Sequence, residues 1–183
     1  MKKIFVALMC AVAIVATSTT AFAQKKAGQT VVKVSFRNAD DTKSTWPFAE
    51  KKFTKEPAVN EATVTLKKTG HAFDLVSSSA MYMNSKFGFM FGGAAGNYMK
   101  LPAVKGKTLT KVSVTYGGKG GLGKLVVADV KGKALEGCKP ATSRDMNYVH
   151  TWEVSGLKKG KPALLMLTAD SVVKMKALEL IYE

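Results

Sequence analysis

Cysteine, arginine and helical periodicity are all scarce in this chain of 183 residues. One of its two cysteines, Cys10, lies in an N-terminal apolar run, so Cys138 is the only cysteine in the rest of the chain. An intramolecular disulfide is therefore excluded there, and we expect Cys138 to be a small apolar filler or an unreactive surface thiol. Apolar residues rarely recur at a spacing of three or four, which argues against a helical fold.

Long apolar runs are also lacking, apart from one at the N-terminus. Two lysines precede the thirteen apolar residues 4–16, and Ala21-Phe22-Ala23 forms a small-x-small cleavage signal. Thirteen residues are too few to cross a bilayer, which takes about 20. We therefore expect residues 1–23 to be a signal peptide and residues 24–183 to form a single domain without a transmembrane segment. The mature protein would then be exported to the periplasm or cell exterior.

Neither a lipid anchor nor a nucleotide site is expected. A lipoprotein signal places a small residue before its cysteine and ends the apolar run there, whereas Met9 precedes Cys10 and the run continues beyond it. Residues 118–124 fit the phosphate-loop pattern G-x-x-x-x-G-K. However, Leu125 stands where Ser or Thr would hold magnesium, and a strand rather than a helix is expected to follow.

Negative charge is in short supply, since the chain has a formal net charge of +15. Without Lys2 and Lys3, 26 basic residues remain against 13 acidic ones. Only Arg37 and Arg144 are arginines, although the guanidinium group is the usual ligand for phosphate and sulfate. The lysines are scattered among expected turns, which favours a solubilising role over a dedicated polyanion site. Binding of envelope polyanions is kept as an alternative.

Alternation of apolar and polar residues is the dominant pattern and predicts β-strands. The clearest runs are 32–36, 109–116, 124–128, 148–154 and 172–182, and Gly-rich turns separate many of the strands. Eight to ten short strands without crossover helices indicate an antiparallel sandwich or barrel. The parity of the strands predicts that several aromatic and histidine side chains face the core. These are Phe87, Phe89, Phe91, Trp152, His71 and His150.

The order of several motifs resembles the small exported β-sandwich proteins of gut Bacteroidetes. The motifs are Trp46-Pro47-Phe48, Gly70-His71-Ala72-Phe73, the segment Y-x-x-L-P-A-x-x-G-K-x-L-T-K-V at 98–112, Thr151–Gly156 and Met175–Tyr182. The resemblance covers nearly all of the mature chain. It implies an all-β, antiparallel jelly-roll β-sandwich, similar to galactose-binding-like and carbohydrate-binding modules, in a cell-envelope setting. The matching residues are framework residues, so the resemblance implies no ligand residue.

Carbohydrate binding needs exposed aromatic rings that stack on sugar faces, with polar groups nearby for the hydroxyls. The aromatic candidates in loops or at strand ends are Trp46, Tyr82 and Tyr148. Their candidate polar partners are Asn84, Asn97 and Arg144. An alternative role for Trp46 is to close one end of the sandwich. A Met-rich loop around Tyr82 could adapt to a partner or serve as packing.

No catalytic residue, cofactor or metal site is expected. The two histidines lack the clustered spacing of a zinc site. Glycoside hydrolysis needs two carboxylates that face each other across a cleft, and the candidates fall on polar strand faces or in turns. They include Glu61, Asp74, Asp129, Asp145 and Glu153. A structural calcium ion at Asp40-Asp41 is left open, although an Asx turn is the preferred interpretation.

The sequence therefore predicts an exported, non-catalytic binding or adhesion-type module, with glycans as the leading class of ligand. Two alternatives are kept: a Lys-rich cationic envelope protein that binds polyanions, and a cryptic glycan hydrolase. Oligomeric state is left open.

Overall fold

The computed structural model describes residues 28–36, 60–79, 81–84, 86–118, 124–142 and 147–183. Every regular element in these ranges is a β-strand. The strands are β1 (Thr30–Ser35), β2 (Asn60–Thr65), β3 (Ala72–Ser77), β4 (Tyr82–Asn84), β5 (Gly88–Gly93), β6 (Tyr98–Lys100), β7 (Leu109–Tyr116), β8 (Lys124–Ala128), β9 (Ala141–Thr142), β10 (Val149–Glu153), β11 (Leu164–Leu167) and β12 (Ser171–Tyr182). No stretch of the described residues forms a helix that is long and apolar enough to cross a membrane.

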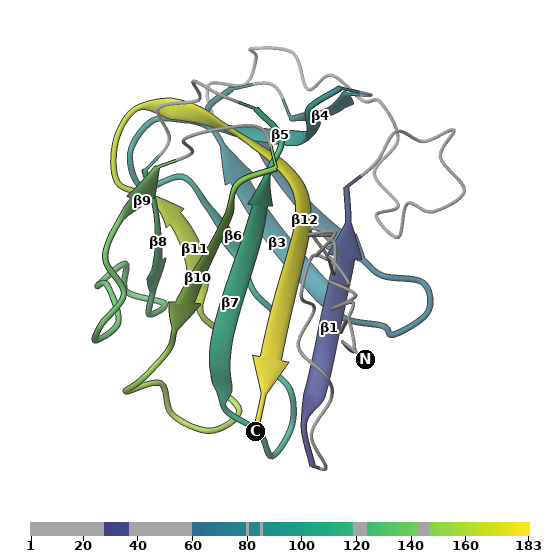
Figure 1. Cartoon of the computed structure of the whole chain (residues 1–183), viewed down its shortest axis with the longest axis vertical. Helices are drawn as coiled ribbons and strands as arrows, with labels where there is room; N and C mark the ends of the chain where they lie inside the picture. Colours follow the sequence, from purple (N-terminus) through teal and green to yellow (C-terminus); the bar gives the residue numbers. More distant parts are fainter. Residues whose placement is uncertain (1–27, 37–59, 80, 85, 119–123, 143–146) are drawn as a thin grey trace, which may run out of the picture.

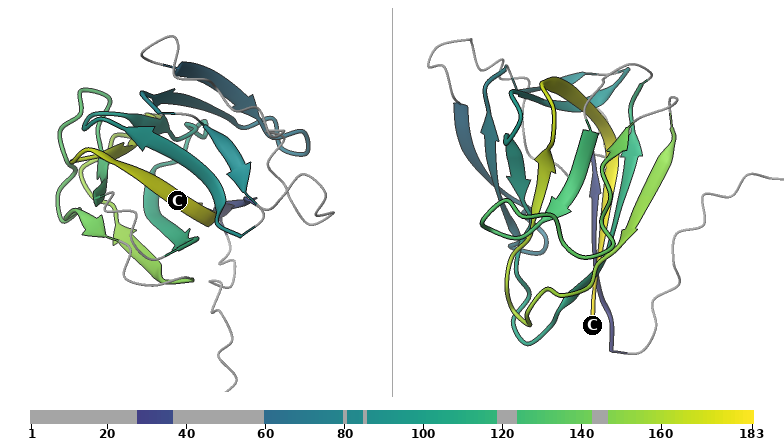
Figure 2. Two further views of the ribbon diagram at one scale, coloured as in Figure 1. Left: turned by 90° about the horizontal axis from the view of Figure 1, so that it is seen from above. Right: turned by 90° about the vertical axis from the view of Figure 1, so that its left-hand side faces the viewer.

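The strands form two antiparallel sheets that face each other (Figures 1 and 2). Sheet A has the order β10-β7-β12-β5-β4, and β1 also pairs with β12. Sheet B has the order β2-β3-β6-β11-β8-β9. The all-β class with antiparallel sheets, predicted from the alternation, is confirmed in the described part of the chain.

Strand β12 organises sheet A because it pairs with three other strands. One of its edges pairs with β7, and its other edge pairs first with β5 and then with β1. A register shift between Met175 and Ala177 changes which residues face inward. Val173 and Met175 are buried before the shift, and Leu178 and Leu180 after it. The shift therefore lets one strand present apolar side chains to the core along its whole length.

The core lies between the inner faces of the two sheets. Phe36 and Phe89 stack at 5.5 Å between ring centroids, and Phe89 and Phe91 at 6.0 Å. These rings come from sheet A, and Phe73, Leu75 and Met99 of sheet B are also buried. Burial of each such side chain stabilises the fold by about 1.5–3 kcal/mol. This shared core is what fixes the outward direction of the alternate residues.

The prediction that these aromatic side chains face the core is confirmed for Phe89, Phe91 and Trp152, but it is wrong for Phe87. Phe87 precedes β5 and is half-buried, with Lys174 Nζ 4.3 Å from the centroid of its ring. Gly88 follows with a φ of +80°, which breaks the extended conformation. Because alternation holds only within a continuous strand, the parity of Phe89 does not extend back to Phe87.

Candidate functional site

The outer face of sheet B carries a cluster of polar side chains around one tyrosine. Strands β2, β3 and β6 bury Val64, Phe73, Leu75 and Met99, so their alternate residues point away from the core. The registers of β2 with β3 and of β3 with β6 align these outward residues across the strands. Two cross-strand rows result: Thr63, Asp74 and Lys100 in one, and Glu61, Val76 and Tyr98 in the next.

Both carboxylate oxygens of Asp74 are hydrogen-bonded within the first row. Thr63 Oγ1 donates to Asp74 Oδ1 at 3.0 Å, and Lys100 Nζ donates to Asp74 Oδ2 at 2.9 Å. The hydrogen bond from Lys100 is the main cause that lowers the pKa of Asp74, and the same bond raises the pKa of Lys100. Asp74 is therefore an ionised acceptor at neutral pH, and Lys100 a charged donor.

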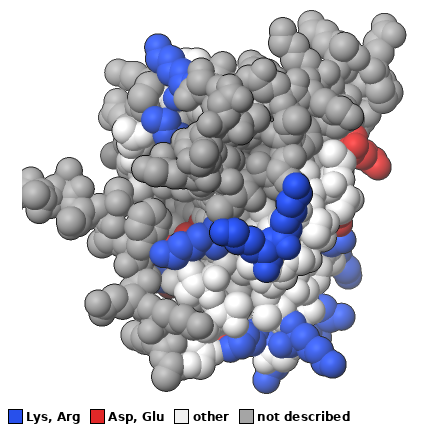
Figure 3. Space-filling model, turned by 90° about the vertical axis from the view of Figure 1, so that its right-hand side faces the viewer, with Lys and Arg blue, Asp and Glu red and all other residues white. Residues whose placement is uncertain are grey.

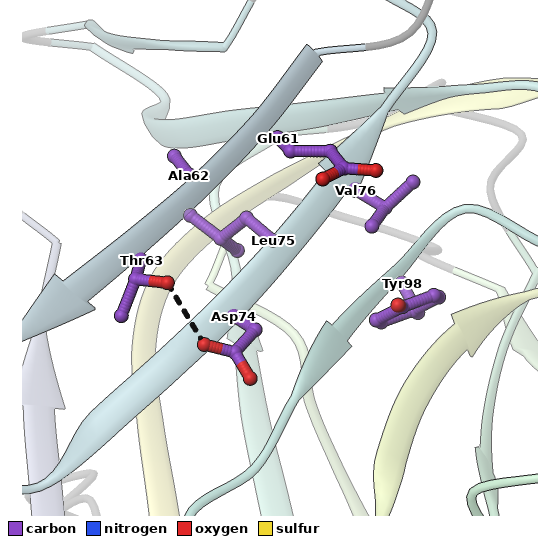
Figure 4. Close-up of a pocket in the computed structure, with 7 residues that line it drawn as sticks. All are labelled: Glu61, Ala62, Thr63, Asp74, Leu75, Val76 and Tyr98. Carbon is purple, nitrogen blue, oxygen red and sulfur yellow. Dashed lines mark hydrogen bonds between the residues drawn. The ribbon is translucent and has the colours of Figure 1, made fainter.

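An open hollow of about 470 Å³ lies over these rows (Figure 4). In this view Asp74 lies between Thr63 on one side and the ring of Tyr98 on the other. Glu61 and Val76 complete the upper side of the same hollow. The half-buried ring of Tyr98 thus lies beside hydroxyl and carboxylate groups on one surface.

A second hollow of about 340 Å³ shares Asp74 with the first. It extends toward the β2–β3 turn and the segment before β11, and its wall includes His71, Lys100, Pro102 and Pro162. Because Asp74 lines both hollows, they meet at its side chain. Together they extend this polar surface of sheet B from Tyr98 to the segment before β3.

This surface has groups for binding but lacks a cluster for metal chemistry. Among the described residues, no group of three His, Cys, Asp or Glu side chains could hold a metal ion. Asp40 and Asp41, the open calcium candidates, lie outside the described residues. Cys138 is buried, its Sγ lies 3.7 Å from the carbonyl oxygen of Glu153, and burial raises the pKa of its thiol. A neutral buried thiol fits the expected role of a small filler.

Four of the six ligand residues expected from the sequence have no described side chain. Trp46 and Arg144 lie outside the described residues, and Tyr82 and Asn84 are placed by their backbone alone, in β4 of sheet A. The structure therefore leaves the expectation for these four as a prediction.

Asn97 is buried, with 8% of its surface exposed, and it holds a corner of the fold. Its Oδ1 accepts hydrogen bonds from the backbone N–H of Ser78 at 2.7 Å and from the Ser78 hydroxyl at 2.9 Å. The backbone N–H of Ala94 donates to the same oxygen at 3.3 Å. The neighbouring Ser77 hydroxyl links β3 to β5 through Gly92. These contacts fix the position of Tyr98, the next residue, at the start of β6.

Tyr148 belongs to an aromatic row on the inner side of β10. Its ring centroid lies 6.1 Å from that of Tyr116 and 6.3 Å from that of His150, which in turn lies 4.4 Å from Trp152. Burial lowers the pKa of His150, so its neutral form predominates at neutral pH. The inward direction predicted for His150 is confirmed. His71, by contrast, lies in the turn before β3 and lines the hollow of Lys100.

A hollow of about 650 Å³ beside β10 is larger but less suited to stacking. Its wall includes His150 and Trp152. Trp152 is only 3% exposed, and its Nε1 donates to the carbonyl oxygen of Lys139 at 2.8 Å. The indole therefore offers no free face to a ligand. For this reason the outer face of sheet B is the better candidate site.

The sequence reasoning missed Tyr98, Thr63 and Lys100. The sequence held a partial signal for this site, because Tyr98 and Lys100 flank the apolar, buried Met99 and so lie on the opposite face of the strand. What the sequence did not reveal was the pairing of β6 with β3, which brings Lys100 to Asp74.

Comparison with known proteins adds no family to this geometry. No family model, no curated protein and no solved structure matches the chain. The candidate site therefore depends on its own geometry.

Proposed function

We propose that this protein is an exported, non-catalytic module that binds a glycan on the outer face of sheet B. The observation that carries the proposal is the half-buried Tyr98 ring beside Thr63, Asp74 and Lys100. Sugars present C–H faces that pack on aromatic rings and hydroxyl groups that bond to charged and polar side chains. Such a surface binds by stacking and hydrogen bonding, without a deep pocket.

The ionised state of the Asp74 carboxylate favours a binding role over a hydrolytic one. A glycosidase needs one carboxyl group that stays protonated near neutral pH, which requires a raised pKa. Lys100 instead lowers the pKa of Asp74, and both of its oxygens are already bonded. Glu61, the other carboxylate of the hollow, is exposed on β2. The proposal therefore assigns Asp74 the role of a hydrogen-bond acceptor for sugar hydroxyls.

A jelly-roll connectivity and export through residues 1–23 are part of the same proposal. The chain crosses between the two sheets at most of its connections, as in Greek-key and jelly-roll folds. Residues 1–23 lie outside the described part of the chain, and their charged and apolar pattern supports the assignment as a signal peptide. The resemblance to exported sandwich proteins of gut Bacteroidetes supports the same setting.

The test is a glycan array probed with the purified protein at low and at high salt. We expect binding at both, because stacking and hydrogen bonds at close range are screened little by salt. Tyr98→Ala should weaken binding about tenfold, whereas Tyr98→Phe should retain it. Val149→Ala on the outer face of sheet A, where Val149 is 45% exposed, is the matched control. A blank array at both salt concentrations, or unchanged binding by Tyr98→Ala, would refute the proposal.

A further inference from the structure

Three neighbouring loops lie toward the end of the molecule where Gly28 and Glu183 lie (Figure 1). They are residues 66–71 between β2 and β3, which project from the flank, and residues 101–108 between β6 and β7 and 155–163 between β10 and β11, which lie at the end itself. The backbone N–H of Gly160 donates to the carbonyl oxygen of Lys107 at 2.7 Å, which joins the second and third loops. Gly70, Ala103 and Pro162, one from each loop, line the same hollow. We call this part of the molecule the lysine end.

Seven lysines that are spread over the sequence lie in these loops. Lys107 is half-buried and the other six are exposed. They are Lys67, Lys68, Lys105, Lys107, Lys158, Lys159 and Lys161. Figure 3 shows blue side chains gathered at the lower end of the molecule, with a further row across the middle of that face.

No acidic residue balances the lysine end from within its loops. The three segments contain neither Asp nor Glu. None of their seven ammonium groups forms an ion pair with the described residues, although Lys33, Lys100 and Lys111 elsewhere do. Glu183 lies nearby, and its Oε1 accepts a hydrogen bond from Gln29 at 2.7 Å. Unpaired like charges held together by the backbone repel each other, which is a cost that an anionic partner would relieve.

We propose that the lysine end binds the phosphate-bearing surface of an anionic lipid bilayer. The loops 101–108 and 155–163 carry five of its lysines and lie at one end of the sandwich, so these lysines can approach a flat surface together, and the β2–β3 turn adds two from the flank (Figure 1). The loops contain no Phe, Tyr or Trp on which nucleic-acid bases could stack. Lysine ammonium groups act as point charges and need no bidentate geometry, which suits a surface of diffuse phosphate charge.

The strength of this contact follows from the number of lysines that reach the surface. Each lysine near an anionic bilayer strengthens binding about fivefold, so loss of three should weaken it about a hundredfold. The attraction falls off within the Debye length, about 10 Å at 0.1 M salt. Binding should therefore disappear at high salt, unlike the glycan binding proposed for sheet B.

The experiment is co-sedimentation of the purified protein with vesicles of phosphatidylglycerol and phosphatidylcholine in equal parts. Pure phosphatidylcholine vesicles report any contribution of the N-terminal apolar run, which would act on both kinds of vesicle. We expect binding to the anionic vesicles at low salt only. Equal binding to both kinds of vesicle would overturn the proposal, and so would a failure to bind either.

A variant of one loop provides the residue-level test. Lys158→Gln, Lys159→Gln and Lys161→Gln together should weaken vesicle binding about a hundredfold. The matched control removes the same charge from the segment that folds back beside β8, where the bridge between Ala128 and Ala134 forms. It carries Lys131→Gln, Lys133→Gln and Lys139→Gln.

We expect the control triple variant to change vesicle binding by less than about threefold. Equal losses in the two triple variants would show a general charge effect and would overturn the proposal. Tighter binding to soluble duplex DNA or heparin than to vesicles, with the same lysine dependence, would also overturn it. Tyr98→Ala should leave vesicle binding unchanged, so this test can fail or succeed independently of the glycan proposal.

Discussion

At the scale of single residues, Gly88 lies where three chain segments approach one another closely. It starts β5 with a φ of +80°, and a Cβ there would lie 2.1 Å from the carbonyl oxygen of Met175. The same Cβ would lie 2.8 Å from the carbonyl oxygen of Phe36. Both oxygens belong to backbone, which cannot swing away as a side chain can. The position therefore needs glycine for space as well as for conformation.

Replacement of Gly88 separates these two requirements. Gly88→Ala should lower the free energy of unfolding by about 3 kcal/mol or more, because it adds a steric clash to an unfavourable φ. Gly106→Ala is the control, since Gly106 has a φ of +74° but open space around its Cβ position. That change should cost only about 1 kcal/mol. Urea denaturation of both variants measures the difference, and equal losses would contradict the steric argument.

At the scale of secondary-structure elements, alternation located most strands but not their partners. Strands β7 and β8 coincide with the expected runs 109–116 and 124–128, because apolar and polar residues alternate or cluster there without interruption. Strands β4 and β9 have three and two residues, too few to show any period. They were therefore missed.

Sheet order was beyond the reach of a single sequence. The ion pair of Asp74 with Lys100 joins residues 26 positions apart, through a register that only the folded sheet defines. The candidate site was missed for the same reason. Parity within one strand indicates which residues face outward, but it does not indicate which outward residues become neighbours.

The Asp74–Lys100 pair between β3 and β6 predicts a dependence of stability on pH. The folded-state pKa of Asp74 is lowered from 3.8, so its contribution is complete well above that value and is lost as pH falls through the lower folded pKa. Both side chains are more than two-fifths exposed, at 43% and 42%, so the contribution is at most about 1 kcal/mol.

Asp74→Asn should accordingly destabilise the protein by up to about 1 kcal/mol at pH near 7 and by less at pH near 2. Urea denaturation of wild type and variant at both pH values gives the two differences. Lys100→Gln in the Asp74→Asn background should have almost no further effect. A loss that stays constant down to the acid limit would show that the ion pair is not its cause.

At the scale of the whole molecule, sheet A ends in β10, an edge strand whose outer side pairs with no other described strand. The Tyr116 N–H donates to the carbonyl oxygen of Tyr148, and the Val154 N–H donates to the carbonyl oxygen of Thr110. The even-numbered residues of β10 are therefore the ones whose backbone groups face β7. The backbone groups of Val149 and Thr151 then point away from β7, and no described residue bonds to their N–H groups. Exposed edges of this kind can recruit a further strand.

Hydrogen exchange tests whether this edge stays free in solution. The amides of His150 and Trp152 should exchange at least about tenfold more slowly than those of Val149 and Thr151. The comparison is internal to one strand, so the solution conditions are the same for all four amides. Uniform protection along β10, at a protein concentration where dimers form, would show instead that a second strand covers the edge.

The antiparallel pairing of β1 with β12 also brings the first described residues next to the last residues of the chain. Thr30 is the register partner of Tyr182, and Gln29 contacts Glu183. Register partners in adjacent antiparallel strands lie about 5 Å apart between Cα atoms. A linker of a few residues could therefore close the backbone into a ring, or allow new ends to be opened in a surface loop, without separating any pair of strands. A fusion partner attached at either end would project from the same pole of the molecule.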